Sequence, residues 1–159
     1  MINKASLLLL SALLICCGAE DTESDVGNIM GDCHPLGTRC FKFVSEERTW
    51  AESERHCVAM GGNLASVHSI EEYSFIQELI PKLTDGTPRT WIGGHDAVEE
   101  GLWFWSDGSR FDYTSWDDAQ PDNQYGVEHC MEMNHGDLKL WNDSPCKYAF
   151  PSVCAVQSV

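Results

Sequence analysis

The chain has 159 residues, of which 43% are hydrophobic and 22% charged, a composition that fits one ordinary globular domain and argues against disorder. It carries 10 Lys and Arg residues against 25 Asp and Glu residues, for a formal net charge of -15 at pH 7. Such a charge repels nucleic-acid phosphates and anionic lipid headgroups, and no basic patch is visible along the chain, so the sequence predicts no nucleic acid partner and no membrane insertion.

The first 19 residues are typical of a secretory signal peptide. Lys4 supplies a short positive region, an uncharged apolar run covers residues 5–15, and small residues lead up to Ala19. The apolar run is shorter than the ~20 residues that a membrane-spanning helix needs. We therefore predict cleavage after Ala19 and a secreted, extracellular product. Residues 20–32 are acidic and poor in apolar side chains, and are predicted to be a flexible N-terminal segment.

Cleavage leaves six of the eight cysteines, and an even number in a secreted chain indicates three disulfides. Spacing alone allows fifteen pairings of six cysteines and does not choose among them. Zinc is the competing use of cysteine, but the sequence contains no CxxC pair and no close Cys and His quartet, so structural zinc is not predicted. The six cysteines are Cys33, Cys40, Cys57, Cys130, Cys146 and Cys154.

Two helices are predicted in the first half of the chain. The first begins after Thr49, whose side chain forms a capping box with Glu52, and it ends at Gly61. The second begins after Ser69 by the same capping logic and carries a broad apolar face up to Pro81. Short apolar runs predict strands over residues 40–44, 91–94, 102–105, 130–134, 139–141 and 151–156.

The later strands enclose a polar stretch, residues 112–128, that is rich in Asp, Asn and Gln and has little periodicity. Long irregular segments inside compact domains are usually functional.

Two clusters of oxygen-bearing side chains stand out in this half of the chain. They supply three carboxylates and two amides, a donor set that suits calcium and that fits the stricter octahedral geometry of magnesium less well. Asp, Asn, Gln and Pro also mark ordinary turns, which is the competing interpretation of either cluster alone. The combination favours a metal site made of Gln120, Asp122, Glu128, Asn142 and Asp143.

These clusters, the Trp91-Ile92-Gly93-Gly94 run and the last three cysteines fall in the order and spacing of the C-type lectin domain. The chain resembles that family over residues 33–155, and within it the small secreted fish lectins of the ladderlectin and nattectin kind, which share their fold with the type II fish antifreeze proteins. Residues 156–159 would be a C-terminal tail. The resemblance implies an α+β fold with two helices flanking small antiparallel sheets, a long calcium-binding loop region, and three disulfides: Cys33–Cys40, Cys57–Cys154 and Cys130–Cys146.

The resemblance also assigns the family's main calcium site to the five oxygen-bearing side chains, with a cis peptide bond at Pro121. Proline lowers the cost of a cis bond to about 0.5–1 kcal/mol, and the bend would let Gln120 and Asp122 point at one ion. Asn142 and Asp143 are neighbours, which a regular strand would send to opposite faces, so we predict that the strand is distorted there.

A second calcium site of some family members is not predicted here. Asp96 and Glu100 match two of its ligands, but Asn123 and His129 stand where two other ligands would be. One calcium ion is therefore expected.

In this family the calcium ion binds two adjacent sugar hydroxyls, which also form hydrogen bonds with the acids and amides around the ion. The Gln-Pro-Asp order goes with galactose-type sugars, so the resemblance implies glycans with galactose-type terminal sugars, on microbial or cell surfaces in innate defence. Galactose-binding relatives usually stack a tryptophan on the sugar. The aromatic residue of this loop is Tyr125, which either stacks, for about 1 kcal/mol, or packs locally. A noncovalent homo-oligomer is compatible with the sequence.

Catalysis and ice binding are the two alternatives to a lectin. Catalysis is not predicted, because no GxSxG, HExxH or P-loop motif occurs and the paired carboxylates would be occupied by metal. The alternative on the same fold is a type II antifreeze-like ice-binding protein. Those relatives carry additional cysteines, including a Cys-Cys pair where this chain has Cys130-Met131, so the missing bridges favour the lectin.

Overall fold

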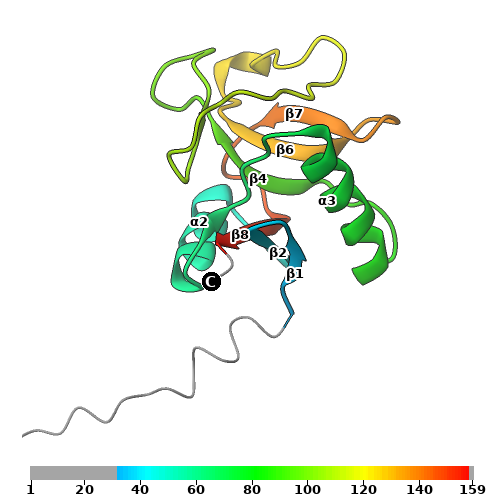
Figure 1. Cartoon of the computed structure of the whole chain (residues 1–159). Coiled ribbons are helices and arrows are strands. Elements are labelled where there is room, and N and C mark those ends of the chain that lie inside the picture. Colours follow the sequence, from blue (N-terminus) through cyan, green and yellow to red (C-terminus); the bar gives the residue numbers. More distant parts are fainter. Residues whose placement is uncertain (1–31, 158–159) are drawn as a thin grey trace, which may run out of the picture.

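The computed structural model describes residues 32–157 (Figure 1). The predicted signal peptide, nearly all of the acidic N-terminal segment and the last two residues lie outside the described residues. No helix in the described part is long and apolar enough to cross a membrane. The helices are α2 (Trp50–Ala59), α3 (Ile70–Leu83) and the short 3-10 helix η1 (Gln124–Gly126); the strands are β1 (His34–Leu36), β2 (Arg39–Arg48), β3 (Asn63–Leu64), β4 (Thr90–His95), β5 (Phe104–Trp105), β6 (Cys130–His135), β7 (Leu140–Ser144) and β8 (Phe150–Gln157).

The strands form hydrogen-bonded ladders in the order β1-β2-β8-β4-β6-β7, with β3 beside β8 and β5 beside β4. All pairs are antiparallel except β4 with β8. Figure 1 shows β1, β2 and β8 in one half of the molecule and β4, β6 and β7 in the other, beneath the long loops, with α2 and α3 to either side. The α+β class with two flanking helices is confirmed. Strand β8 extends to Gln157, into the predicted C-terminal tail.

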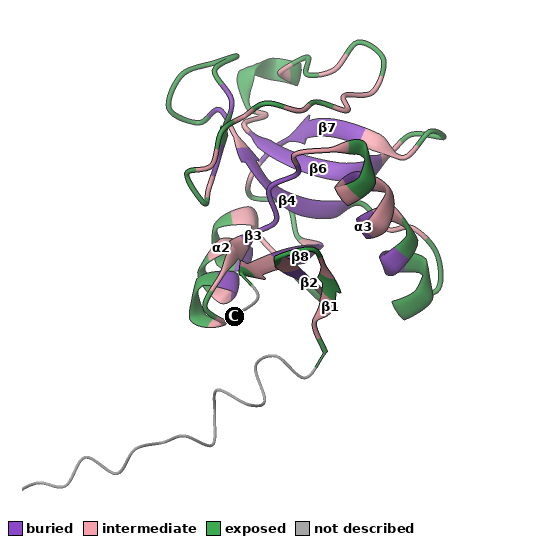
Figure 2. Ribbon diagram, in the orientation of Figure 1, coloured by how far each residue is buried: buried purple, intermediate pink, exposed green. Residues whose placement is uncertain are grey.

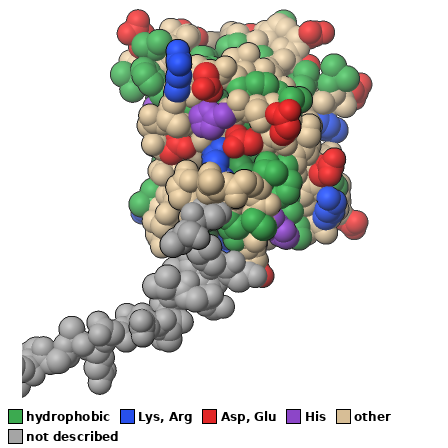
Figure 3. Space-filling model, in the orientation of Figure 1, with side chains coloured by type: hydrophobic (Ala, Val, Ile, Leu, Met, Phe, Trp, Pro, Cys, Tyr) green, Lys and Arg blue, Asp and Glu red, His purple; other side chains and the backbone are tan. Residues whose placement is uncertain are grey.

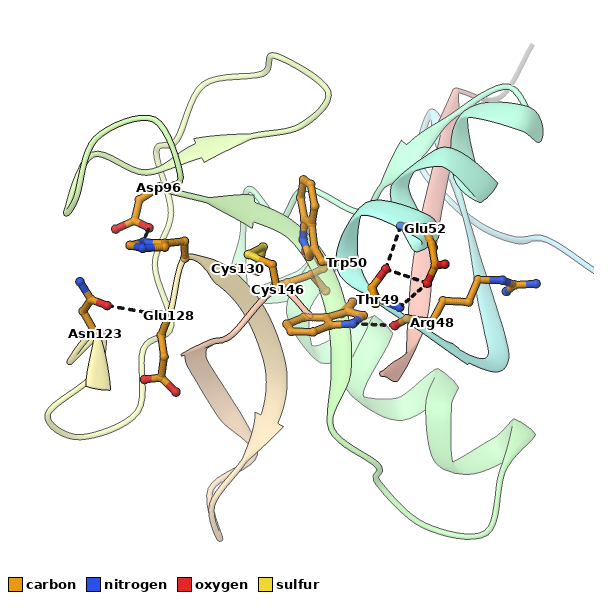
Figure 4. Close-up of a disulfide and its surroundings, with 12 residues drawn as sticks. Arg48, Thr49, Trp50, Glu52, Asp96, Asn123, Glu128, Cys130 and Cys146 are labelled. Atoms are coloured by element: carbon orange, nitrogen blue, oxygen red, sulfur yellow. Dashed lines mark hydrogen bonds and ion pairs between the residues drawn. A yellow bond between two sulfur atoms is a disulfide. The ribbon is translucent and has the colours of Figure 1, made fainter. Parts of the chain in front are cut away.

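Helix α2 begins with the predicted capping box. The Thr49 hydroxyl accepts a hydrogen bond from the Glu52 backbone N–H at 3.4 Å, and a Glu52 carboxylate oxygen accepts one from the Thr49 backbone N–H at 3.1 Å (Figure 4). Two N–H groups that the first helical turn cannot pair internally are thereby satisfied.

Helix α3 differs from its prediction at both ends. Ser69 caps it by accepting from the Glu72 backbone N–H at 3.2 Å, but the Glu72 carboxylate accepts from the His68 N–H and pairs with Arg39, both at 2.8 Å. Only half of a capping box forms, because Arg39 and the backbone N–H of His68 bind the Glu72 carboxylate. The helix also continues past Pro81, since a proline in the last turn removes one backbone hydrogen bond without ending the helix.

The core is built around tryptophans, and Figure 2 shows β4, β6 and β7 almost entirely buried. Trp141 of β7 is fully buried and meets the rings of Tyr113 and Trp116 edge to face at 5.7 and 5.8 Å. Its backbone N–H donates to the Ser115 carbonyl and its carbonyl accepts from the Asp117 N–H, both at 2.8 Å. The first part of the long loop is thus fixed to the strand that carries Asn142 and Asp143.

The three disulfides expected from the resemblance are present. Cys33–Cys40 joins the segment before β1 to β2, Cys57–Cys154 joins α2 to β8, and Cys130–Cys146 joins the start of β6 to the segment after β7. The last of these lies beside Trp50 (Figure 4), whose backbone N–H donates to the Cys146 carbonyl at 3.1 Å. It connects the strands on which the candidate site is built.

Candidate functional site

Three carboxylates from separate segments converge at one end of the sheet. One oxygen each of Asp122, Glu128 and Asp143 lies within 4.8 Å of the others. Asp122 follows the Gln120–Pro121 peptide bond, which is cis. Glu128 lies between η1 and β6, and Asp143 lies in β7. The loop and the strand therefore bring together three acids that the sequence had placed in two clusters.

The same carboxylates hold the loop backbone. Asp143 accepts hydrogen bonds from the backbone N–H groups of Asp122 at 3.2 Å and Asn123 at 2.8 Å. Glu128 accepts from the Gln124 N–H at 2.9 Å, and its own N–H donates to the Asn123 side-chain oxygen at 3.0 Å (Figure 4). Asn123 has a left-handed backbone with a φ of 43°, which asparagine tolerates better than most residues. These contacts fix where the acids of the loop lie.

The crowding of the acids changes their acidity. Burial raises the pKa of Asp143 above its ordinary value, and the charge of Asp122 raises it further, although backbone N–H groups of Asn123, Asp122 and Asp143 itself oppose the shift. Burial is also the main cause of the raised pKa of Glu128, with added repulsion from Asp143 and Asp122. Three negative charges at this distance are mutually unfavourable, and a bound cation or proton would relieve the repulsion.

The two amides complete the group. The side-chain oxygen of Gln120 is buried and has no hydrogen-bond partner within the described part of the chain, an arrangement that costs roughly 1–3 kcal/mol unless a ligand satisfies it. Asn142 donates through its Nδ2 to Glu132 at 2.9 Å, which leaves its Oδ1 as an acceptor. Gln120, Asp122, Glu128 and Asn142 all line one cavity of about 260 Å³.

The prediction of a distorted strand at Asn142 and Asp143 is wrong. Asn142 pairs with Glu132 and Asp143 with Met131 in regular register, and the irregularity of the ladder lies between Glu132 and His135. Asn142 and Asp143 can reach the same loop from opposite faces of β7, because β7 is the edge strand of the sheet and the loop folds around that edge. The donor set offers only oxygen atoms, in a flexible arrangement, and therefore fits calcium.

Behind Asn142 lies an ion pair that the sequence analysis missed. Glu132 is fully buried and receives hydrogen bonds from both Nε and Nη2 of Arg89, the former at 2.5 Å. Burial raises the pKa of Glu132, and Arg89 opposes that shift. Because Glu132 also accepts from the Asn142 amide, the pair orients Asn142 so that its oxygen is free for the cavity. Nothing in the spacing of these residues indicated the pairing.

Tyr125 lies apart from the cavity. The residue is 90% exposed, its backbone is left-handed with a φ of 60°, and it is not among the residues that line the cavity. The aromatic side chain that does line it, with His135, is Tyr148, from the segment between β7 and β8. Tyr148 was not predicted as a site residue, because it lies far along the chain from the polar loop.

A second group of possible metal ligands consists of Asp96, Glu100 and His129, again within 4.8 Å of one another. His129 Nδ1 lies 3.1 Å from Asp96 Oδ1 and 3.5 Å from Glu100 Oε2, and the Asn123 amide donates to Glu100. These polar groups already pair with one another. A single calcium ion remains our prediction.

A Ser-His-Asp chain lies elsewhere in the structure. Asp112 contacts His68 Nδ1 at 2.9 Å, and Ser109 Oγ lies 3.1 Å from His68 Nε2. The Ser109 hydroxyl donates instead to Asp107, at 2.5 Å. A nucleophilic serine must give its proton to the imidazole, so this arrangement lacks the hydrogen bond on which such catalysis depends.

Comparison with known proteins agrees with this architecture. Residues 46–156 match the family described as Lectin C-type domain. The chain is 53% identical over 117 residues to ladderlectin of Oncorhynchus mykiss, covering 74% of this chain and 62% of that protein. It is 49% identical over 119 residues to the galactose-specific lectin nattectin of Thalassophryne nattereri, covering 75% and 74%. It is 44% identical over 117 residues to a type-2 ice-structuring protein of Osmerus mordax, covering 74% and 65%.

Solved structures give the same result. The herring type II antifreeze protein aligns with a TM-score of 0.75 at 40% identity, covering 81% of this chain and 98% of that one. The C-type lectin CEL-I of Cucumaria echinata aligns with a TM-score of 0.75 at 28% identity, covering 79% and 94%. With a family match across most of the domain, the chain belongs to the C-type lectin domain family, whose domains bind carbohydrates and are not enzymes.

Proposed function

We propose that the chain is a secreted, calcium-dependent lectin that binds galactose-type sugars on microbial or cell-surface glycans. The observation that carries the proposal is the convergence of Asp122, Glu128 and Asp143 within 4.8 Å of one another. Gln120 and Asn142, which line one cavity together with Asp122 and Glu128, would complete the ligand set. Residues 1–19 would be the signal peptide, 20–32 a lead-in, 33–155 the lectin domain and 156–159 the tail, with Val156 and Gln157 contributing to β8.

Bound calcium would supply coordination positions for two adjacent hydroxyls of a sugar. The protein's own part is to hold hydrogen-bonding groups around those hydroxyls: the carboxylates of Asp122 and Glu128 accept, and the Gln120 amide donates. The order of amide and acid around Pro121 supports a galactose-type preference, as does similarity to a lectin described as galactose-specific. The surface charge is compatible with a neutral ligand, since Figure 3 shows scattered acidic side chains and no continuous basic patch on the face in view.

Affinity chromatography tests the proposal directly. The protein is expected to stay on immobilised galactose in calcium buffer and to leave when a chelator is added, because removal of the ion leaves the hydroxyls with side-chain contacts only. Passage through the column in both buffers would contradict the assignment. A calorimetric titration with calcium alone distinguishes loss of the metal site from a different sugar preference.

Ice binding is the second candidate, favoured by similarity to proteins described as type-2 ice-structuring proteins and by the antifreeze structure with the same fold. Ice-crystal shaping by the protein in the absence of sugar retention would establish it. Sugar retention without any effect on ice growth would dismiss it.

Acid is expected to release both calcium and sugar. The pKa values of Glu128 and Asp143 are raised by burial, so both groups take up protons more readily than ordinary carboxyls, and protons compete with the metal. In the metal-free protein a raised carboxyl pKa lowers the stability of the fold at pH values above the ordinary pKa of the group. As pH rises, the unfolded chain loses the proton before the folded chain does. Calcium should therefore raise the unfolding temperature at pH 7 and have little effect at pH 4. Equal retention on galactose at the two pH values would refute this scheme.

A further inference from the structure

The cavity has a second wall that the calcium ligands do not supply. Besides Gln120, Asp122, Glu128 and Asn142, it is lined by a group of five residues from η1, β6, β7 and the segments before β4 and after β7. At about 260 Å³ it lies below the roughly 300–1,000 Å³ of pockets that enclose a drug-sized ligand, so a glycan would lie across its mouth. The group consists of Arg89, Gln124, His135, Ser144 and Tyr148.

Tyr148 presents an aromatic ring that is half exposed beside this wall. The residue is 46% exposed, while its backbone N–H donates to the Pro145 carbonyl at 2.9 Å. The Phe150 ring meets it edge to face, with centroids 6.3 Å apart. On the same Phe150 ring lies the guanidinium of Arg89, 4.8 Å from the centroid. Tyr148 and Arg89 are thus parts of one packed group and not loose surface side chains.

Arg89 retains hydrogen-bonding capacity toward solvent. Its Nε and Nη2 donate to Glu132, and Nη2 also donates to Ser144 at 3.0 Å. Within residues 32–157 no partner receives the N–H groups of Nη1, and the side chain is 42% exposed. Glu132 balances the positive charge, and the other charged groups of the cavity are the carboxylates of Asp122 and Glu128. The wall therefore suits a neutral, hydroxyl-rich ligand better than an anion.

We propose that Tyr148 and Arg89 form a subsite for a second, neutral sugar residue, linked to the hexose that the calcium site holds. This inference rests on the proposed function and adds the preference for a disaccharide over a monosaccharide. The Tyr148 ring would pack against the apolar face of the second sugar, and Arg89 Nη1 would donate to one of its oxygens. Tyr148, and not the 90% exposed Tyr125, is the ring that recognises sugar.

Binding of methyl β-galactoside and lactose in calcium buffer tests the subsite. An aromatic contact of this kind corresponds to roughly three- to tenfold in affinity, so the wild-type protein should bind lactose more tightly than methyl β-galactoside by about that factor. Tyr148→Ala should reduce this preference to near one. Tyr148→Phe keeps the ring and should keep the preference, and Tyr125→Ala should keep it as well.

Two results would overturn the subsite: an unchanged lactose preference in Tyr148→Ala, or loss of the preference in Tyr125→Ala. Tighter binding of lactobionate, in which the second residue carries a carboxylate, than of lactose would refute its neutral character. Absence of binding of every sugar by the wild-type protein, with or without calcium uptake, would instead defeat the proposed function itself. The unfolding temperature and calcium titration of each variant show whether a lost preference reflects the subsite or a damaged fold.

Discussion

Asp122→Ala is expected to abolish calcium-dependent sugar retention and leave the domain folded. The side chain is exposed and lies within 4.8 Å of the Glu128 and Asp143 carboxylates, so its removal takes one negative ligand from the site without opening the core. Changes to groups that merely support metal ligands typically cost 10–100-fold in affinity, and loss of a direct ligand should weaken calcium binding by at least ~100-fold. Calorimetric calcium titration and the galactose column give the two measurements.

Asp118→Ala is the matched control, because Asp118 is an exposed acid of the same loop that lies outside both acidic groups. It removes the same charge and should keep calcium uptake and sugar retention. Equal loss of calcium uptake and sugar retention in the Asp122 and Asp118 variants would mean that the acids act only through overall charge. Wild-type retention by Asp122→Ala would place the sugar site elsewhere on the protein.

Removal of the Cys57–Cys154 disulfide is expected to cause the largest loss of stability of the three possible disulfide deletions. It closes a loop with a sequence separation of 97, for which the loss of chain entropy in the unfolded state corresponds to about 4.7 kcal/mol. Both cysteines are also buried, so alanines in their place would leave space in the core. Urea unfolding of Cys57→Ala/Cys154→Ala under oxidising conditions measures the loss.

Cys33→Ala/Cys40→Ala is the matched comparison, since that disulfide has a separation of 7 and an expected contribution of about 2.4 kcal/mol on the same basis. The two double variants should therefore differ by about 2 kcal/mol in the free energy of unfolding. Equal losses would show that loop entropy does not dominate the contribution of these bridges. Calcium uptake should survive in both variants at temperatures where they remain folded.

Much of the fold could be predicted because its signals are local. The Thr49–Glu52 capping box depends on residues three apart, and the structure reproduces both of its hydrogen bonds. The six predicted strands lie within a few residues of β2, β4, β5, β6, β7 and β8, since apolar runs report burial directly, whereas the short strands β1 and β3 were not predicted. The disulfide pairing was different: composition gave the number of bridges, and only resemblance to a family selected the pairs.

Predictions failed where a distant residue competed for a local group. Glu72 was expected to complete a second capping box, but Arg39, 33 residues earlier, engages its carboxylate. Asn142 and Asp143 were expected to require a distorted strand, whereas their position on an edge strand allows the loop to reach both of its faces. In the first case the fold supplied a partner that the local pattern did not contain, and in the second it supplied a strand position that the pattern did not contain.

By itself the amino-acid sequence determined the chemistry available to this protein: an acidic domain with paired cysteines, two capped helices and a cluster of oxygen ligands. The tertiary structure alone decided which groups share a cavity. It placed Tyr148 and the Arg89–Glu132 pair beside the candidate calcium ligands and left Tyr125 in solvent. The physical reason is that side-chain type and short-range spacing are written along the chain, whereas a binding wall depends on strand order and loop path, which bring together residues that are distant in sequence.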